Sequence, residues 1–207
     1  PVRKEFISMT REAARAELGL GEEPLVVSAF GSLGAKVMNE TMADMMALEQ
    51  KDSFPFHHIH ATGKFGWEWM PREIGELGVD MENEKSLDIR EYIYDMPVQM
   101  AAADLVISRA GAMSISELAL TGKAVVFIPS PYVAENHQYK NAMALVDQDA
   151  ALCVEEHKLA DGALTETVLP LLLAPAKRKS MSERITAFAC PDANQRIYES
   201  LMGLIKS

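Results

Sequence analysis

Residues of the types that bind nucleotides gather between positions 105 and 141. Within this stretch, an apolar run ends at Arg109, and small residues and Ser114 follow before a helical pattern begins. Small residues let a diphosphate approach the backbone, and a helix N-terminus favours its negative charge. Arg109 could add a charge-assisted hydrogen bond to the same phosphates. The stretch therefore predicts a site for a nucleotide-linked ligand.

Glu117 has two interpretations. Ser114 and Glu117 are three residues apart before an apolar run, which is the spacing of a capping box that needs no ligand. Alternatively, the Glu117 carboxylate accepts hydrogen bonds from two vicinal ribose hydroxyls. The residues by themselves leave both interpretations open.

Gln138 and Asn141 are a second pair of candidate binding residues. They are three positions apart, so they share one face of a helix. Neutral amides donate and accept hydrogen bonds, which suits the hydroxyls of a sugar. The alternative is an ordinary polar surface, which is the more frequent explanation of an isolated pair.

A glycine turn, Gly31-Ser32-Leu33-Gly34, follows a predicted buried strand and precedes a helix. Such a turn lets backbone N–H groups and a serine hydroxyl approach an anion, although it can also be a turn without a ligand. It differs from the dinucleotide fingerprint GxGxxG. The second strand also lacks the acidic residue that a nicotinamide-binding unit places near the ribose, because it ends in His60-Ala61-Thr62. An oxidoreductase is therefore disfavoured.

The histidines do not indicate a metal site. His57, His58 and His60 lie on the second predicted strand, where we expect His58 to face opposite to the other two and all three to be structural. No carboxylate spacing accompanies them. His137, beside the proposed site, is expected to have a structural or orienting role. The sequence offers binding groups without a recognisable nucleophile or general base.

These candidate residues need a scaffold that brings strand ends together. Apolar runs predict strands, and helical patterns alternate with them, which indicates one Rossmann-like α/β domain over residues 1–207 with a roughly six-stranded parallel sheet and helices on both faces. Ligands bind such sheets at the carboxyl ends of the strands. Val37, Met38, Met42, Met45 and Met46 are expected on the apolar face of one helix. The strands are predicted at 24–30, 56–61, 87–93, 105–107, 124–128 and 151–154, and the other helices at 3–18, 66–77 (interrupted by Pro71), 97–103 and within 159–207.

Composition narrows the class of protein. The chain has 207 residues, 48% of them hydrophobic, and a formal net charge of -10. This acidity argues against nucleic-acid binding through the phosphate backbone and against adhesion to anionic lipid by charge alone. The two cysteines, Cys153 and Cys190, have no CxxC spacing, so a reducing, cytoplasmic compartment is expected. The chain starts at Pro1 and leads directly into a helical pattern, so we expect a piece of a longer protein.

Three motifs resemble a known family: GSLGA at 31–35, SRAGAMSISELALTGK at 108–123 and IPSPYVAENHQYKNA at 128–142. They are similar to the C-terminal half of the MurG family, bacterial N-acetylglucosaminyltransferases of glycosyltransferase family 28 that make the lipid-linked disaccharide of peptidoglycan. The resemblance covers nearly the whole chain. It implies half of a GT-B fold and binding of the donor UDP-N-acetylglucosamine, with no metal ion and no cofactor.

The resemblance also implies roles for individual residues. Ser32 would contact the donor, Arg3 its phosphates, and Ile93, at the end of the third strand, would hold uracil through its backbone. Gln138 and Asn141 would hold the sugar hydroxyls. The diphosphate and ribose would lie against the run Ala112, Met113, Ser114, Ile115, Ser116 and Glu117, with Glu117 on the ribose hydroxyls.

Two departures from the family pattern have consequences. Phe30 stands where the family more often has a glycine, and we expect it to narrow the approach to the glycine turn. The family's N-terminal domain, which has the site for the lipid-linked acceptor, the proposed catalytic base and the membrane-contacting patch, is expected to be absent. We therefore assign no catalytic residue and expect donor binding without sugar transfer.

Three alternatives remain open. The chain could be a stand-alone donor-binding subunit that works with a separate membrane partner, or a UDP-sugar epimerase with the same fold. It could also be a scaffold domain without a ligand. As part of a full-length transferase, it would act at the cytoplasmic face of the cell membrane.

Overall fold

The computed structural model describes residues 2–206 and contains one six-stranded, all-parallel sheet. The strands lie in the order β3-β2-β1-β4-β5-β6, so the chain reverses its direction of winding between β1 and β4. This confirms the predicted parallel sheet. The strands are β1 Leu25–Ala29, β2 His57–Ala61, β3 Leu87–Arg90, β4 Leu105–Ser108, β5 Val125–Phe127 and β6 Leu152–Cys153.

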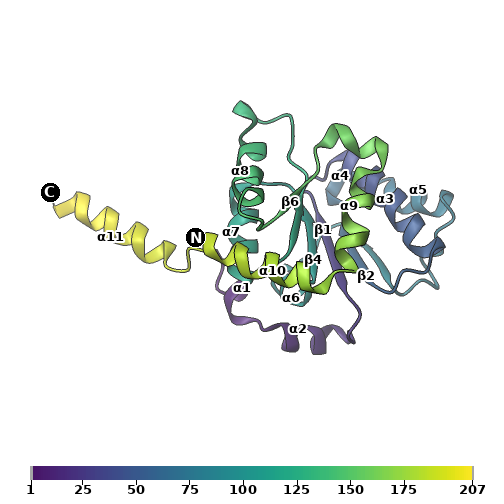
Figure 1. The fold of residues 1–207 in the computed structure, drawn as a ribbon, viewed down its shortest axis with the longest axis horizontal. Helices are drawn as coiled ribbons and strands as arrows, with labels where there is room; N and C mark the ends of the chain where they lie inside the picture. Colours follow the sequence, from purple (N-terminus) through teal and green to yellow (C-terminus); the bar gives the residue numbers. More distant parts are fainter. Residues whose placement is uncertain (1, 207) are drawn as a thin grey trace.

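Helices cover both faces of the sheet (Figure 1). The first half of the chain supplies α1 Glu5–Ser8, α2 Arg11–Leu18, α3 Lys36–Lys51, α4 Gly63–Trp67, α5 Met70–Glu76 and α6 Met96–Ala102. The second half supplies α7 Ala112–Thr121, α8 His137–Val146, α9 Ala163–Leu172, α10 Pro175–Ile185 and α11 Ala193–Lys206. Short 3-10 helices are η1 Ala134–Asn136, η2 Glu156–Asp161 and η3 Thr186–Phe188.

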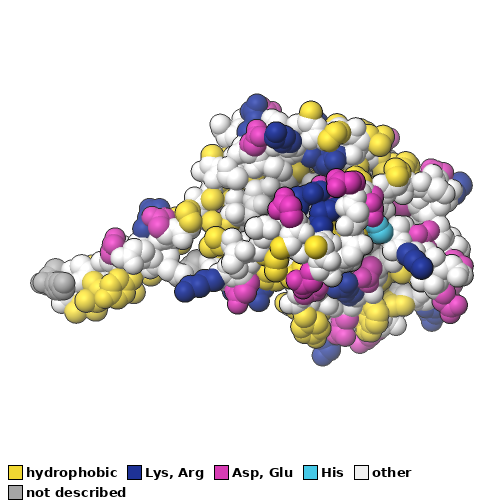
Figure 2. All heavy atoms as spheres, turned by 90° about the horizontal axis from the view of Figure 1, so that it is seen from below, with side chains coloured by type: hydrophobic (Ala, Val, Ile, Leu, Met, Phe, Trp, Pro, Cys, Tyr) yellow, Lys and Arg dark blue, Asp and Glu magenta, His cyan; other side chains and the backbone are white. Residues whose placement is uncertain are grey.

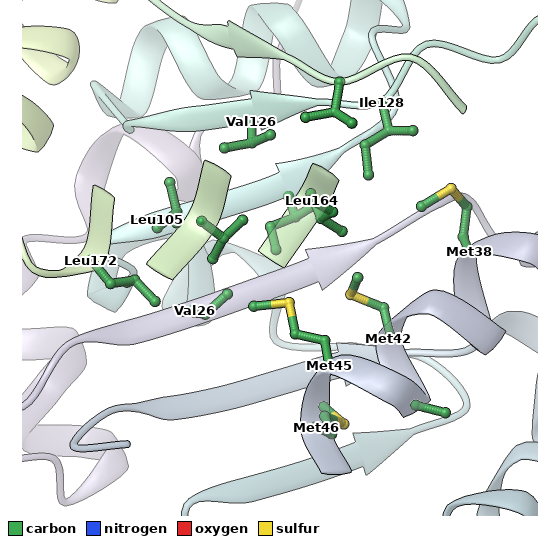
Figure 3. Close-up of a cluster of buried hydrophobic side chains, with 14 of the residues drawn as sticks. Val26, Met38, Met42, Met45, Met46, Leu105, Val126, Ile128, Leu164 and Leu172 are labelled. Atoms are coloured by element: carbon green, nitrogen blue, oxygen red, sulfur yellow. The ribbon is translucent and has the colours of Figure 1, made fainter. Parts of the chain in front are cut away.

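The methionine stripe of α3 fills the core on one face of the sheet (Figure 3). Met38, Met42, Met45 and Met46 are at most 1% exposed and belong to the same cluster as side chains of β1, β4 and β5. Flexible methionine side chains fill such irregular space well. The prediction for Val37 was wrong: Val37 is 36% exposed, because it lies one position, about a third of a turn, away from the buried stripe.

Strand residues that point the other way form the second core, under α1, α2, α6, α7 and α8. Leu25 and Val27 of β1, with Val106 of β4, are at most 2% exposed. Strands buried on both faces read as continuous apolar runs in the sequence, which is why they were predictable.

Two predicted helices are broken, each for a local reason. The helix predicted at 3–18 is two helices, because Met9 is extended and the Thr10 hydroxyl accepts a hydrogen bond from the Ala13 N–H to cap α2. In the second case, Pro71 lies in the first turn of α5, where proline is tolerated, and the break comes before it at Trp69. The third strand also ends earlier than predicted, at Arg90.

The last helix, α11, projects away from the body of the molecule (Figure 1). Hydrophobic side chains gather along one edge of this arm in Figure 2, and Ile197, Leu201 and Ile205 are 47%, 55% and 76% exposed. Within residues 2–206, no helix combines the length and the apolar character needed to cross a membrane.

Candidate functional site

A pocket of about 260 Å³ lies at the carboxyl ends of β1 and β4, where the winding reverses. In sheets of this kind the crevice at this position is the usual ligand site. The strands contribute Val27, Ala29, Ala61, Val106 and Ser108 to its wall. The remaining lining residues come from the surrounding helices and loops: Arg3, Phe6, Gly31, Ser32, Tyr92, Ile93, Met96, Met100, Ser114, Glu117 and Leu118.

Five of the predicted binding residues therefore line one pocket although they are distant in the sequence. Arg3, Ser32 and Ile93 enter it from three different segments, and Ser114 and Glu117 enter it from α7. The topology of the sheet brings these segments together; Ser114 and Glu117 were candidates from their spacing, whereas Arg3 and Ile93 were implied by the family resemblance alone.

Glu117 does not form a capping box, so that interpretation was wrong. Helix α7 begins at Ala112 after Gly111, and no side chain caps it, so Ser114 lies inside the first turn. The Glu117 carboxylate makes no hydrogen bond or ion pair with any residue of the described chain, 2–206. Partial burial raises its pKa above the usual value, and the positive charge of Arg3 acts in the opposite direction. A half-buried, unpaired carboxylate facing a pocket is suited to accept hydrogen bonds from a ligand.

The glycine turn is held by the next loop of the sheet. Gly31 and Gly34 have φ values of 96° and 76°, a region that favours glycine. The Lys64 N–H donates to the Ser32 carbonyl at 3.1 Å, which fixes the backbone beside the pocket. The side chain of Phe30 is 6% exposed and belongs to the α3 core, with its ring 6.0 Å from that of His60. The expectation that Phe30 narrows the approach to the turn was therefore wrong.

Ile93 lies in the loop after β3 rather than at the strand end. Its side chain is 1% exposed, while its backbone N–H and carbonyl bond to no other group among residues 2–206. This arrangement leaves a donor and an acceptor available at the pocket wall. Tyr92, which sequence reasoning missed, also lines the pocket, and its ring lies 5.0 Å from that of Tyr94.

Phe6, Met96 and Met100 were missed as well. They are apolar residues on α1 and α6, and the sequence marks them only as ordinary core positions. For Met96 and Met100 the one available signal was their place in the fold, since α6 follows the strand that leads to Ile93.

Arg109 does not line this pocket. Its guanidinium donates to the Ile128 carbonyl at 3.0 Å and lies 2.6 Å from the Glu156 carboxylate, an ion pair without the alignment of a hydrogen bond. The two side chains are 14% and 9% exposed. Arg109 thus ties the end of β4 to the end of β5 and to η2.

Gln138 and Asn141 also lie outside this pocket, and each ties α8 to a loop. The Ser130 N–H donates to Gln138 Oε1 at 3.0 Å, and Asn141 Nδ2 donates to the Ala110 carbonyl at 3.2 Å. Each amide keeps one polar atom, Gln138 Nε2 and Asn141 Oδ1, without a partner among the described residues. Binding of a sugar by these atoms stays a prediction.

The remaining predicted residues lie along α7. Ala112 and Met113 are exposed at its start, and Met113 is 54% exposed. Ile115 packs partly against the second core, and the Ser116 hydroxyl donates to the Ala112 carbonyl at 2.9 Å. The backbone N–H groups of the first turn of α7 have no side-chain cap, so they are available to an anion at this end of the helix.

The histidines of β2 are structural, but one detail of the prediction was wrong. His58 and His60 share a face, and His57 points the other way, because strand residues two apart lie on the same side. His57 contacts Glu23 at 3.1 Å, whereas His58 and His60 both bond Ser28. Across residues 2–206, no group of three or more His, Cys, Asp or Glu side chains could hold a metal ion.

The chain is similar to known proteins in both sequence and fold. The model of the glycosyltransferase family 28 C-terminal domain matches residues 25–197. A UDP-N-acetylglucosamine--N-acetylmuramyl-(pentapeptide) pyrophosphoryl-undecaprenol N-acetylglucosamine transferase from Acetivibrio thermocellus is 38% identical over all of this chain and 55% of its own length. The protein of the same name from Cytophaga hutchinsonii is 35% identical over all of this chain and 54% of its own.

The crystal structure of Acinetobacter baumannii MurG, a GT-B protein, superposes with a TM-score of 0.76 at 27% identity. The match covers 98% of this chain and 55% of the MurG chain. The chain thus spans about half the length of the relatives it matches. On the match over residues 25–197 and the shared fold, the chain belongs to the glycosyltransferase family 28 C-terminal domain family.

Proposed function

We propose that this chain is the donor-binding half of an inverting glycosyltransferase that uses UDP-N-acetylglucosamine. The observation that carries the proposal is the unpaired Glu117 carboxylate facing the pocket at the β1–β4 crevice. The acceptor would be a lipid-linked N-acetylmuramoyl-pentapeptide, as the names of the relatives indicate. These names favour a transferase over an epimerase.

The pocket residues divide into groups that suit the parts of such a donor. Uracil would lie against the free backbone N–H and carbonyl of Ile93, and the ribose hydroxyls would donate to Glu117. The diphosphate would meet Arg3, the Ser32 hydroxyl and the uncapped N–H groups at the start of α7. These N–H groups favour anions without a metal ion.

The same N–H groups would contribute to the transfer step. An acceptor hydroxyl attacks the anomeric carbon, the bond to the UDP oxygen breaks, and the link inverts. Negative charge grows on the diphosphate as it leaves, and fixed dipoles and Arg3 stabilise that charge. The base that takes the acceptor proton would be supplied by the rest of a longer protein, working at the cytoplasmic face of the membrane.

Calorimetry on the whole 207-residue chain tests donor binding. We expect UDP-N-acetylglucosamine to bind more tightly than UDP-glucose, with Gln138 and Asn141 among the residues that favour the N-acetylated sugar. Glu117→Ala should weaken binding of UDP by roughly 10- to 100-fold, because hydrogen bonds to a charged group are worth about 1.5–3 kcal/mol.

Glu76→Ala is the matched control, since Glu76 is an exposed carboxylate on α5 away from the pocket. Equal affinity of wild type and Glu117→Ala for UDP would remove Glu117 from the site. Absence of any binding of UDP by the wild-type chain would refute the proposal as a whole. A radiolabel assay should show no transfer to the lipid acceptor by this chain without a further domain.

A further inference from the structure

A series of five hydrogen-bonded, buried polar side chains runs through the core under the glycine turn. Ser28 of β1, His58 and His60 of β2, and Asn39 of α3 are each 0% exposed, and Glu49 of α3 is 4% exposed. Glu49 contacts His58 Nδ1 at 3.0 Å, and Ser28 Oγ bonds His58 Nε2 and His60 Nδ1, both at 2.8 Å. His60 Nε2 bonds Asn39 Oδ1 at 3.1 Å.

The end of this series at Asn39 fixes which atoms donate and which accept. Asn39 Nδ2 donates to the Thr62 carbonyl at 2.9 Å, and a carbonyl oxygen can only accept. Turning the Asn39 amide over would place two oxygens against each other. Asn39 Oδ1 is therefore an acceptor, and His60 Nε2 has to carry a hydrogen.

The hydrogens can then be counted. Four hydrogen bonds join Glu49, His58, Ser28, His60 and Asn39 in series, and each needs one hydrogen. A serine and two neutral histidines supply three, because a carboxylate and an amide oxygen supply none. The series of five side chains therefore lacks one hydrogen unless it holds an additional proton.

Burial decides where that proton lies. Removal from water lowers the pKa of His60 to about 3, and the nearby charge of His58 acts in the same direction, so His60 is neutral. His58 differs because it contacts the Glu49 carboxylate, and a buried charge needs such a partner. Among residues 2–206, the titratable groups of this hydrogen-bonded series are Glu49 from α3 and His58 and His60 from β2. Strand β1 contributes only the neutral Ser28.

We propose that Glu49 and His58 share one additional proton, which directs the hydrogen bonds through Ser28, His60 and Asn39 and makes these five residues positioning residues of the ligand pocket. The link to the pocket is the Thr62 carbonyl. A Cβ built on Gly34 would lie 2.0 Å from that oxygen, so the carbonyl is packed directly behind the glycine turn. The inference about the proton does not depend on which ligand the pocket binds.

Nitrogen NMR of the whole chain with labelled histidine tests the proton. At pH 7 we expect both ring nitrogens of His58 to be protonated and His60 to carry its hydrogen on Nε2 alone. A neutral His58 beside a protonated Glu49, read from the carboxyl carbon, supports the same count. An ionised Glu49 with two neutral histidines would overturn the proposal, as would a doubly protonated His60.

Glu49→Gln is a conservative rescue. The amide of the new side chain can donate to Nδ1 of a neutral His58, so the hydrogen-bonded series has its four hydrogens without the additional proton. We expect this variant to keep a neutral, Nε2-protonated His58 at pH 7 and to bind UDP within about twofold of wild type. If His58 of wild type is doubly protonated, a His58 that stays doubly protonated in Glu49→Gln would overturn the sharing of that proton with Glu49.

Asn39→Asp tests the link to the pocket. A carboxylate oxygen would face the Thr62 carbonyl in place of a donor, and we expect affinity for UDP to fall about tenfold, equivalent to one buried hydrogen bond. Wild-type affinity in a folded Asn39→Asp protein would disprove the positioning role. If wild type itself fails to bind UDP, the proposed function fails, whereas the NMR result still decides the proton. The amide signals of Gly34 and Lys64 in Asn39→Asp then report the position of the turn.

Discussion

The guanidinium of Arg109 lies 2.6 Å from the carboxylate of Glu156, and both side chains are largely buried. The sequence places Arg109 directly before the small residues of the predicted diphosphate site, which suggests a phosphate ligand. In the structure its charged partner is instead the Glu156 carboxylate, at the start of η2. This contact makes the effect of replacing Arg109 predictable.

Arg109→Ala should lower the free energy of unfolding by about 3 kcal/mol, because it leaves the buried Glu156 carboxylate without a partner. Urea denaturation measures this loss. The double variant Arg109→Ala/Glu156→Gln should recover part of it, since no charge is then left buried and unpaired. Affinity for UDP should change less than in Glu117→Ala. A large loss of UDP affinity with unchanged stability would instead place Arg109 on the phosphates.

The contact between two loops makes Gly34 sensitive to substitution. A Cβ at Gly34 would lie 2.0 Å from the Thr62 carbonyl, and its φ of 76° is already unfavourable for other residues. Gly34→Ala should therefore cost more than the roughly 1–2 kcal/mol of left-handed strain alone, and it should displace Ser32 and weaken binding of UDP.

Gly19→Ala is the control for this substitution. Gly19 has a φ of 66° at the end of α2, and a Cβ there would meet nothing within 4 Å. Gly19→Ala should lose only the stability that left-handed backbone strain costs, and its affinity for UDP should be unchanged. Equal costs in denaturation experiments for the two variants would mean that the turn moves freely away from Thr62.

Much of the fold was predictable because the central strands β1, β4 and β5 are buried almost throughout and read as apolar runs. The ends of elements were less predictable, since they depend on single contacts. Thr10 caps α2 and divides the first predicted helix, and β3 ends at Arg90, whose side chain pairs with Asp88 and Asp95. Spacing alone could not reveal these partners.

The candidate site was predictable to the same degree. Ser32, Ser114 and Glu117 were found because small and polar residues follow strands and begin helices. Tyr92 was missed, since nothing in its local pattern distinguishes it from a surface aromatic residue. The hydrogen bond between the Ser130 N–H and Gln138 Oε1 was also missed, because the sequence cannot show whether an amide bonds a neighbouring loop or a ligand.

Binding of UDP should depend on pH through Glu117. Burial raises the pKa of this carboxyl. The ionised form accepts charge-assisted hydrogen bonds on both oxygens, whereas protonation turns one oxygen into a donor. Affinity should therefore fall as pH decreases through that raised pKa. Glu117→Gln should bind weakly at neutral pH and lose this dependence, which calorimetry over a pH series measures. A wild-type affinity that is flat across the acidic range would contradict the assigned role.

The same shift has the opposite effect on stability. The folded state holds the Glu117 proton more tightly than the unfolded state, so this group lowers stability as pH rises from the unfolded pKa, about 4.5, through the folded one. Glu117→Gln should thus be at least as stable as wild type at pH 7. Thermal unfolding without ligand tests this, and a clear loss of stability would indicate a structural partner for Glu117.

Lys123, which does not line the pocket, gives a second pH dependence. Its Nζ donates to the Ala101 and Ala103 carbonyls at 2.7 and 3.1 Å, and burial lowers its pKa from 10.5 to about 8. Between these values the folded state is neutral while the unfolded state still binds the proton, so stability contributed by Lys123 should rise with pH. A neutral amine keeps two N–H groups, so neither hydrogen bond is lost.

The difference in unfolding free energy between wild type and Lys123→Met isolates this effect, because the other titrating groups cancel. It should grow in favour of wild type by roughly 1 kcal/mol per pH unit above pH 8 and level off near the unfolded pKa. Urea denaturation at several pH values measures the difference. A constant difference would show that Lys123 stays protonated in the folded protein, with enough solvent or negative charge around it to offset its burial.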